Sequence, residues 1–137
     1  MQTVYFTAAY WCLLTAAILP IACAGVAKGG MFGKPRRDVG YDNDNPRAWL
    51  ARQKDWRARA NAAQANIFEA LPFFMAAVVI AHQLGANQGR LDVLAFLFVV
   101  LRILYVMMYV GGMSNARSVV WTAAFVVNVA ILFLGYR

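Results

Sequence analysis

Apolar residues fill four long stretches of the chain, at about residues 4–27, 60–84, 91–110 and 116–134, and polar residues separate them. Each stretch has about the 20 residues that an α-helix needs to cross roughly 30 Å of hydrocarbon. The pattern predicts an all-α integral membrane protein in which residues 1–137 form a single domain with four transmembrane helices.

The polar connections between these stretches differ in length. The first, at about residues 28–56, is long, whereas the other two are the short segments "GANQGR" and "GGMSN". Short connections make successive helices antiparallel neighbours, so we expect an up-down four-helix bundle. In the long loop, turn residues precede Pro46, and we expect a short helix from Pro46 to about Trp56, capped by Asn45 and lying at the membrane interface.

Composition and charge support a membrane protein. Hydrophobic residues make up 62% of the chain, against roughly 45–50% in ordinary soluble domains. The formal net charge of +7 would suggest nucleic acid for a soluble protein, but the basic residues concentrate between residues 28 and 59. By the positive-inside rule this segment faces the cytoplasm, which places both termini outside, in the plasma (inner) membrane if the protein is bacterial. We expect the lipid bilayer as a partner and no nucleic acid. The basic residues concerned include Lys28, Lys34, Arg36, Arg37, Arg47, Arg52, Lys54 and Arg57.

The first apolar stretch resembles a signal peptide, because it ends in the small residues of "IACAGVA". No Lys or Arg precedes it and it exceeds the usual length of about 7–15 residues, so we expect a retained transmembrane helix. Cys12 and Cys23 share one face of this helix, cannot form a disulfide with each other, and are expected to pack in the core. His82 has no second His or Cys at metal-binding spacing, and no metal site is predicted.

Polar residues also occur inside two of the predicted transmembrane helices. At 1.5 Å per residue, Glu69 and Arg102 both lie roughly 12–15 Å from the cytoplasmic ends of their antiparallel helices. A lone charge in hydrocarbon costs at least about 2.5 kcal/mol, so we expect these two residues to form a salt bridge. Helical spacings of three and seven residues place the polar side chains in two stripes, namely Arg59, Asn66 and Glu69 on one helix and Arg102, Tyr105 and Tyr109 on the next.

These stripes have two interpretations. Polar side chains can hold transmembrane helices together with roughly 0.6–2 kcal/mol each, without any ligand. Alternatively they line a binding site, because they lie in the cytoplasmic half only and because "MSNARS" adds Arg117 and Ser118 at the same level, with Trp121 one turn further. A half-buried cationic pocket of this kind suits a small anionic ligand from the cytoplasm and an apolar one from the membrane.

Two segments, "DNDNPRAWLARQKDWRARANAAQANIFEALPFF" and "RILYVMMYVGGMSNARS", resemble the bacterial branch of the MAPEG superfamily, the membrane-associated proteins in eicosanoid and glutathione metabolism. The resemblance rests on N-x-x-E in the second helix together with R-x-x-x-x-x-x-Y in the third and Arg-Ser at the start of the fourth. It implies a four-helix homotrimer with glutathione sites between neighbouring subunits near the cytoplasmic side. The implied activity is conjugation of glutathione to a small lipophilic electrophile, or reduction of a lipid hydroperoxide.

The resemblance also implies roles for individual residues. Arg and Lys would hold the carboxylates of glutathione, Glu69 its ammonium group, and a nearby arginine would lower the thiol pKa from about 8.5 toward neutrality. Arg117 is the leading candidate for thiolate activation, with Tyr109 or Ser118 as a nearby donor. The expected glutathione-binding residues are Lys28, Arg59, Asn66, Glu69, Arg102, Tyr105 and Trp121.

The sequence departs from the family pattern at two positions. The best-known enzymes of the family have arginines where this chain has Ala62 and Ala65, and Arg57 and Arg59 are the nearest substitutes. The departure favours an alternative, a lipid-binding or scaffolding membrane protein of the same fold without enzymatic activity. A small multidrug-type transporter fits less well, because the first helix has no carboxylate and the first loop is long.

Overall fold

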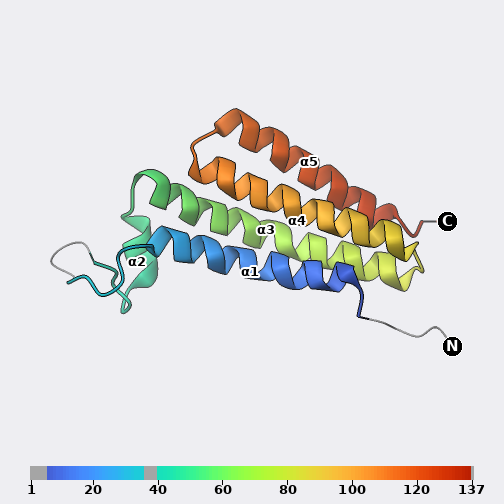
Figure 1. Cartoon of the computed structure of the whole chain (residues 1–137), viewed down its shortest axis with the longest axis horizontal. Helices are drawn as coiled ribbons and strands as arrows, with labels where there is room; N and C mark the ends of the chain where they lie inside the picture. Colours follow the sequence, from blue (N-terminus) through green and yellow to red (C-terminus); the bar gives the residue numbers. More distant parts are fainter. Residues whose placement is uncertain (1–5, 36–39, 137) are drawn as a thin grey trace.

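The computed structural model describes residues 6–35 and 40–136. Within them the chain is helical, with four long helices, α1 (Ala8–Lys28), α3 (Asp55–Gln83), α4 (Gln88–Val110) and α5 (Ser114–Phe133), and one short helix, α2 (Pro46–Ala51). All four long helices are long and apolar enough to cross a membrane. They run alternately up and down, so the first and last described residues lie at the same end of the bundle (Figure 1). The predicted all-α four-helix bundle is confirmed.

The largest difference from the predicted helix ends is at the start of α3. The predicted start of the first helix, at residue 4, lies outside the described residues. Helix α3 begins at Asp55, not at residue 60, and its 29 residues make it about 43 Å long, more than the roughly 30 Å of a hydrocarbon core. Its first turns are polar and project beyond the apolar part of the bundle, where hydropathy alone does not reveal a helix.

Small residues let the helices approach one another closely. Along α1 they recur every three to four residues on the face that packs against α3 and α4. Without a Cβ branch or a long side chain in between, two backbones gain van der Waals contact that lipid tails cannot provide. Cys12 and Cys23 belong to this face and are free, buried thiols, as predicted. The buried residues of α1 are Ala9, Cys12, Ala16, Pro20, Cys23 and Ala27.

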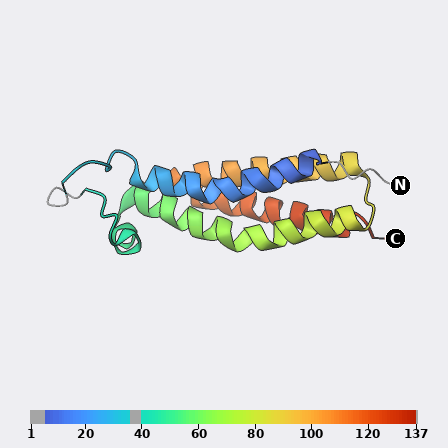
Figure 2. The same ribbon diagram turned by 90° about the horizontal axis from the view of Figure 1, so that it is seen from below.

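The long loop forms its own small core at one end of the bundle. Trp49 on α2 is 3% exposed, and the edge of its ring meets Tyr41 with 5.2 Å between centroids. The ammonium of Lys28 lies 4.6 Å from the centroid of the same Tyr41 ring. Helix α2 crosses the end of the bundle instead of running along it (Figure 2).

The short helix differs from the prediction in three respects. It ends at Ala51, so Trp56 belongs to the start of α3, and the Asn45 side chain makes no capping hydrogen bond. Trp49 packs inside the loop and not against lipid. Turn chemistry and Pro46 at the first helical position located the start of α2 correctly, but the buried aromatic partner, Tyr41, lies in an irregular segment that has no periodic signal.

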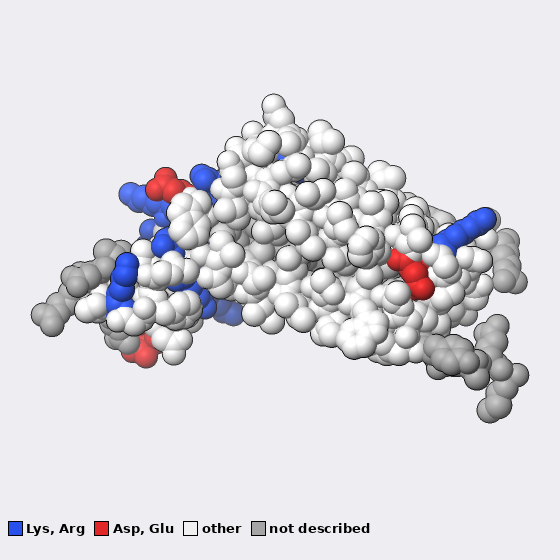
Figure 3. Space-filling model, in the orientation of Figure 1, with Lys and Arg blue, Asp and Glu red and all other residues white. Residues whose placement is uncertain are grey.

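Lysine and arginine side chains gather at this same end (Figure 3). Two of them bind the ends of other helices. Arg57 donates from Nη1 to the carbonyls of Ala27, at 2.9 Å, and Gly29, at 2.7 Å, and Arg59 donates from Nε to the carbonyl of Val110 at 2.9 Å. These carbonyls lie at the C-termini of α1 and α4, where they have no helical partner and carry partial negative charge.

At the opposite end of the bundle, a carboxylate on α4 joins this helix to α1. Oδ1 of Asp92, in the second turn of α4, accepts hydrogen bonds from the backbone N–H of Ala9 at 2.9 Å and from Nε2 of Gln88 at 2.8 Å. The N–H of Ala9 is one of the free donors at the start of α1, where a negative charge is favourable. Helices α1 and α4 are therefore tied together at this end, and α3 is tied to both of them at the loop end.

Candidate functional site

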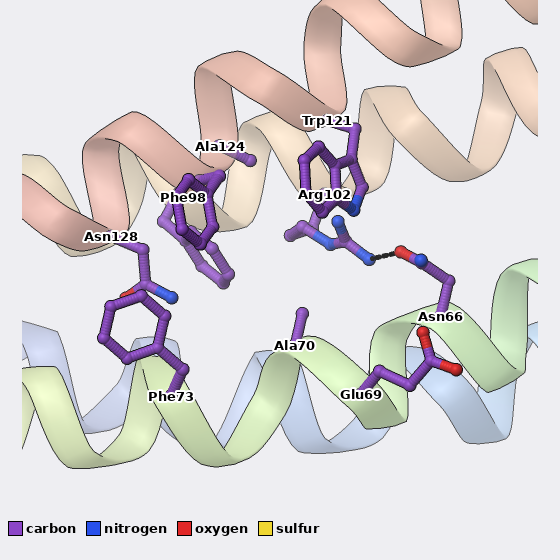
Figure 4. A pocket seen from close by; sticks show the side chains of 10 residues that line it. Asn66, Glu69, Ala70, Phe73, Phe98, Arg102, Trp121, Ala124 and Asn128 are labelled. Atoms are coloured by element: carbon purple, nitrogen blue, oxygen red, sulfur yellow. Dashed lines mark hydrogen bonds between the residues drawn. The ribbon is translucent and has the colours of Figure 1, made fainter.

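A cavity of about 150 Å³ lies between α3, α4 and α5, about halfway along the bundle. Figure 4 shows Arg102, Asn66 and Glu69 toward one end of it, near Trp121, and the rings of Phe73 and Phe98 toward the other, near Asn128. The residues that line it are Asn66, Glu69, Ala70, Phe73, Phe98, Arg102, Trp121, Ala124, Phe125 and Asn128. Four of them, Asn66, Glu69, Arg102 and Trp121, were predicted from the sequence, and the cavity brings these four together.

Arg102 is the buried charge of this site. Only 2% of it is exposed, and its Nη2 donates a hydrogen bond of 2.7 Å to Oδ1 of Asn66 on α3. The guanidinium also lies over the ring of Tyr105, 4.4 Å from the centroid, one turn along the same helix. Its Nε has no hydrogen-bond partner. A buried guanidinium with donors to spare, held in place by an amide and an aromatic face, is suited to bind an oxygen-rich ligand.

The predicted salt bridge between Glu69 and Arg102 is wrong. Asn66 takes the position that was expected for the carboxylate, and the Glu69 side chain is turned away from Arg102 (Figure 4). Glu69 is exposed at the edge of the cavity. Asn66 and Glu69 lie three residues apart on one face, about 4.5 Å along the helix axis, so depth alone could not decide which of them meets the arginine.

The predicted stripe on α4 continues from Arg102 toward the loop end as a ladder of rings and cations. The rings of Tyr105 and Tyr109 meet edge to face, with 5.5 Å between centroids. The guanidinium of Arg117, on α5, lies 4.1 Å from the centroid of the Tyr109 ring. Each cation faces the electron-rich surface of a tyrosine. The two arginines thus lie at opposite ends of one continuous polar and aromatic track.

The remaining predicted residues lie outside the cavity within a single chain. Lys28 faces Tyr41 in the loop core, and Arg59 binds the carbonyl of Val110 at the end of α4. Ser118 is exposed, and its hydroxyl donates to the carbonyl of Ser114, one turn earlier. All three belong to the loop end of the bundle, toward which the track from Arg102 to Arg117 leads.

Asn128 was not predicted from the sequence. This residue of α5 is 2% exposed and lines the aromatic end of the cavity, and its Oδ1 has no hydrogen-bond partner. The signal was present, because Asn128 is a single amide in the apolar run "AFVVNVAILF", and polar residues in such runs face the interior of a bundle. Two of the aromatic walls, Phe98 and Phe125, were equally invisible in a sequence rich in apolar residues, whereas Phe73 continues the helix face of Asn66 and Glu69.

The cavity opens at its side, between α3 and α5. Glu69, Trp121 and Phe125 are exposed there. The rings of Trp121 and Phe125 are nearly parallel, with 5.6 Å between their centroids. Ligand pockets usually have roughly 300–1,000 Å³, so the cavity within one chain, at about 150 Å³, is smaller than a typical ligand pocket. Within the described part of the chain, no three His, Cys, Asp or Glu residues are grouped so as to hold a metal ion.

Comparison with known proteins agrees with the four-helix membrane bundle. No individual curated protein and no solved structure gives a significant match. A family model, however, matches residues 8–136, nearly all of the chain, and it is described as the MAPEG family. The match includes the four long helices and every residue of the cavity. The chain therefore belongs to the MAPEG family.

Proposed function

We propose that the protein is a membrane-embedded, glutathione-dependent transferase or peroxidase that acts on lipophilic electrophiles or lipid hydroperoxides. The observation that carries this proposal is the buried Arg102, which is fixed by Asn66 and keeps an unpartnered N–H beside the cavity. A charge this deep in an apolar bundle is unfavourable unless it faces a partner or water. An anionic, oxygen-rich cosubstrate such as glutathione is a suitable partner.

The distribution of charge around the cavity fits the parts of glutathione. Its two carboxylates would bind Arg102 and the cations at the loop end, and its ammonium would bind Glu69, which has no ion pair or hydrogen bond within the described structure. Its thiol would then lie toward Arg117 and Tyr109, which contact each other. The lipophilic substrate would enter from the bilayer through the opening between α3 and α5.

A homotrimer with the site between subunits would complete the cavity. The exposed edge formed by Glu69, Trp121 and Phe125 is apolar except for one carboxylate, and α5 exposes further large side chains such as Val119 and Val126. A neighbouring subunit on this edge would supply the missing walls. Lys28 and Arg59 lie outside the cavity of their own chain, at the loop end. From there they would contact a ligand that is bound between their chain and a neighbouring subunit. In the bilayer, the loop end would face the cytoplasm and both termini the outside.

In the transferase reaction the thiolate sulfur attacks the electrophilic carbon. A carbon–sulfur bond forms, the leaving group departs with its bonding electron pair, and the thiol proton is released to solvent. The chain's own residues would make the thiolate available: the positive charge of Arg117 favours the ionised form, and the hydroxyl of Tyr109 or Ser118 donates a hydrogen bond to it. In the peroxidase reaction two thiols supply two electrons, and the hydroperoxide becomes an alcohol and water while a disulfide forms.

A second candidate is a lipid-binding or scaffolding protein without enzymatic activity. The alanines at positions 62 and 65, where the best-known enzymes of the family have arginines, favour it. Arg57 and Arg59 bind backbone carbonyls of their own chain, which leaves their guanidinium groups partly occupied. This candidate predicts that phospholipid or fatty acid purifies with the protein and that glutathione does not bind.

The ultraviolet difference spectrum of detergent-purified protein with and without glutathione separates the two candidates. Bound thiolate absorbs at about 240 nm, whereas the thiol form does not. The enzyme predicts a thiolate band at neutral pH and conjugation of chlorodinitrobenzene, and the Arg117→Gln variant should lack both. If wild-type protein shows no thiolate band, no heat of glutathione binding and no conjugation, the enzymatic function is wrong.

A further inference from the structure

Asn128 is a polar group that neither the fold nor the binding of glutathione uses. It lies on α5 two turns beyond Trp121, about 10 Å farther along the helix, and is 2% exposed. In Figure 4 its carboxamide points into the cavity beside Phe73 and Phe98. Its Oδ1 has no hydrogen-bond partner. A buried polar group without a partner costs about 1–3 kcal/mol, so Asn128 requires a hydrogen-bond partner that the protein itself does not supply.

Two structural roles for Asn128 do not agree with its surroundings. Amides often join transmembrane helices by hydrogen bonds, but within the described residues Asn128 makes no hydrogen bond to a neighbouring helix. A second copy that packs on the exposed edge at Glu69, Trp121 and Phe125 would not touch Asn128, because the residue is already enclosed by α3, α4 and α5 of its own chain. The partner must therefore be a molecule small enough to enter the cavity.

We propose that Asn128 is a specificity-determining residue that selects lipophilic ligands carrying a hydroxyl group on their otherwise apolar part. A carboxamide can accept a hydrogen bond from a hydroxyl and also donate one to it. The apolar part of the ligand lies among Phe73, Phe98 and Phe125, between the Arg102–Asn66 pair at one end and Asn128 at the other. This inference deepens the proposed function and rests on it only in placing the lipophilic substrate in this cavity.

The chemistry of this end of the cavity favours a neutral hydroxyl over a charged group. Its other walls are three phenylalanine rings and Ala124, which offer nothing to neutralise an ion. Without ligand, water can satisfy the amide, because a cavity of about 150 Å³ has room for it. A ligand hydroxyl would replace that water and keep its hydrogen bond, while the attached chain fills the apolar space. A chain without a hydroxyl would displace the water and leave Asn128 unpartnered.

The test compares 10-hydroxyoctadecanoic acid with octadecanoic acid, two non-electrophilic probes that differ in one hydroxyl. Their affinities are measured by equilibrium binding of radiolabelled acid to the full chain in lipid nanodiscs, without glutathione. One net neutral hydrogen bond corresponds to a preference of about two- to tenfold for the hydroxy acid. In the Asn128→Leu variant this preference should disappear, mainly through tighter binding of octadecanoic acid, and Asn128→Val provides a second replacement should the first not fold.

Thr122→Val is the matched control. It removes a hydroxyl from the same helix, one that is exposed and bonded to the Ser118 carbonyl, and it should leave the preference unchanged. Equal affinities of wild-type protein for the two acids, absence of binding for both, or a preference that persists in the Asn128 variants would each overturn the proposal. The result does not depend on glutathione: a preference that requires Asn128 in a protein without thiolate chemistry would support this inference while refuting the enzymatic function.

Discussion

Arg102 and Asn66 join α4 to α3 in the interior of the bundle through a hydrogen bond of 2.7 Å from Nη2 to Oδ1. The contact gives a buried cation a neutral partner, so the site keeps its positive charge. An ion pair with Glu69 would have neutralised the cavity. The observed arrangement leaves one cation for a ligand carboxylate and one carboxylate, at the edge, for a ligand ammonium.

The Asn66–Arg102 contact predicts energetic coupling between the two residues. Asn66→Ala should lower the free energy of unfolding by about 1.5–3 kcal/mol, since it removes a hydrogen bond to a charged group. In the double variant with Arg102→Met the loss should be clearly smaller than the sum of the single losses. Unfolding of detergent-solubilised protein by titration with sodium dodecyl sulfate measures both. Glu69→Ala combined with Arg102→Met should be additive, and coupling between Glu69 and Arg102 would contradict the observed geometry.

Glu69 is expected to recognise the ammonium of glutathione without stabilising the fold. Glu69→Gln should weaken glutathione binding about tenfold or more, because it removes a charge-assisted contact, while the unfolding transition stays within about 0.5 kcal/mol of wild type. Isothermal titration calorimetry measures the affinity. Deaminated glutathione, which lacks the ammonium, is the matched ligand control. It should bind wild type and Glu69→Gln equally, and an equal loss for both ligands would exclude this role.

Arg57 is expected to stabilise the bundle and to be dispensable for glutathione binding. Its Nη1 donates to two carbonyls at the end of α1, so Arg57→Leu should destabilise the protein by about 1–3 kcal/mol. Arg52→Leu, at an exposed position just after α2, is the control and should change stability by less than about 0.5 kcal/mol. Calorimetry of both variants with glutathione completes the test. A selective loss of glutathione binding in Arg57→Leu would instead place Arg57 in the site.

Arg117 should control the ionisation of bound glutathione. Under the proposed function its positive charge lowers the thiol pKa, so we expect thiolate at neutral pH in the wild type. In Arg117→Gln the pKa of the bound thiol should rise toward about 8.5, and the thiolate band should appear only as the pH increases through that value. A pH titration of the absorbance near about 240 nm measures the midpoint. Arg90→Gln, at the other end of the bundle, is the charge-matched control and should leave the midpoint where wild type has it.

The sequence predicted the membrane bundle and the helices that build the site because both depend on periodicity. Twenty apolar residues define a span, and a spacing of three and seven defines a face. Asn66, Glu69 and Arg102 were therefore correctly grouped around one space. The pairing of their side chains was not predicted correctly. Side-chain rotamers decide whether Asn66 or Glu69 contacts the guanidinium, and a sequence pattern does not distinguish two residues that lie three apart on one helix face.

Such patterns do not predict hydrogen bonds from side chains to the backbone carbonyls at helix ends. In the sequence, Arg57 and Arg59 are the nearest substitutes for the arginines absent at positions 62 and 65. In the structure they bind the carbonyls of Ala27 and Val110. Nothing in a linear pattern shows that the start of one helix lies beside the ends of two others, because this follows only from how the helices are staggered.

The side-chain hydrogen bonds at the two ends of the bundle are not distributed evenly among the four long helices. Asp92 fastens α1 to α4, and Arg57 and Arg59 fasten α1 and α4 to α3, whereas within the described chain no side-chain hydrogen bond joins α5 to another helix. Helices α1, α3 and α4 are thus held together by hydrogen bonds, and α5 contacts them through apolar packing and through the cation–π contact of Arg117 with Tyr109. A tilt of α5 would sacrifice that contact and apolar contacts, which acyl chains can replace. Helix α5, which carries Trp121 and Asn128, is accordingly the helix whose displacement would break the fewest polar contacts.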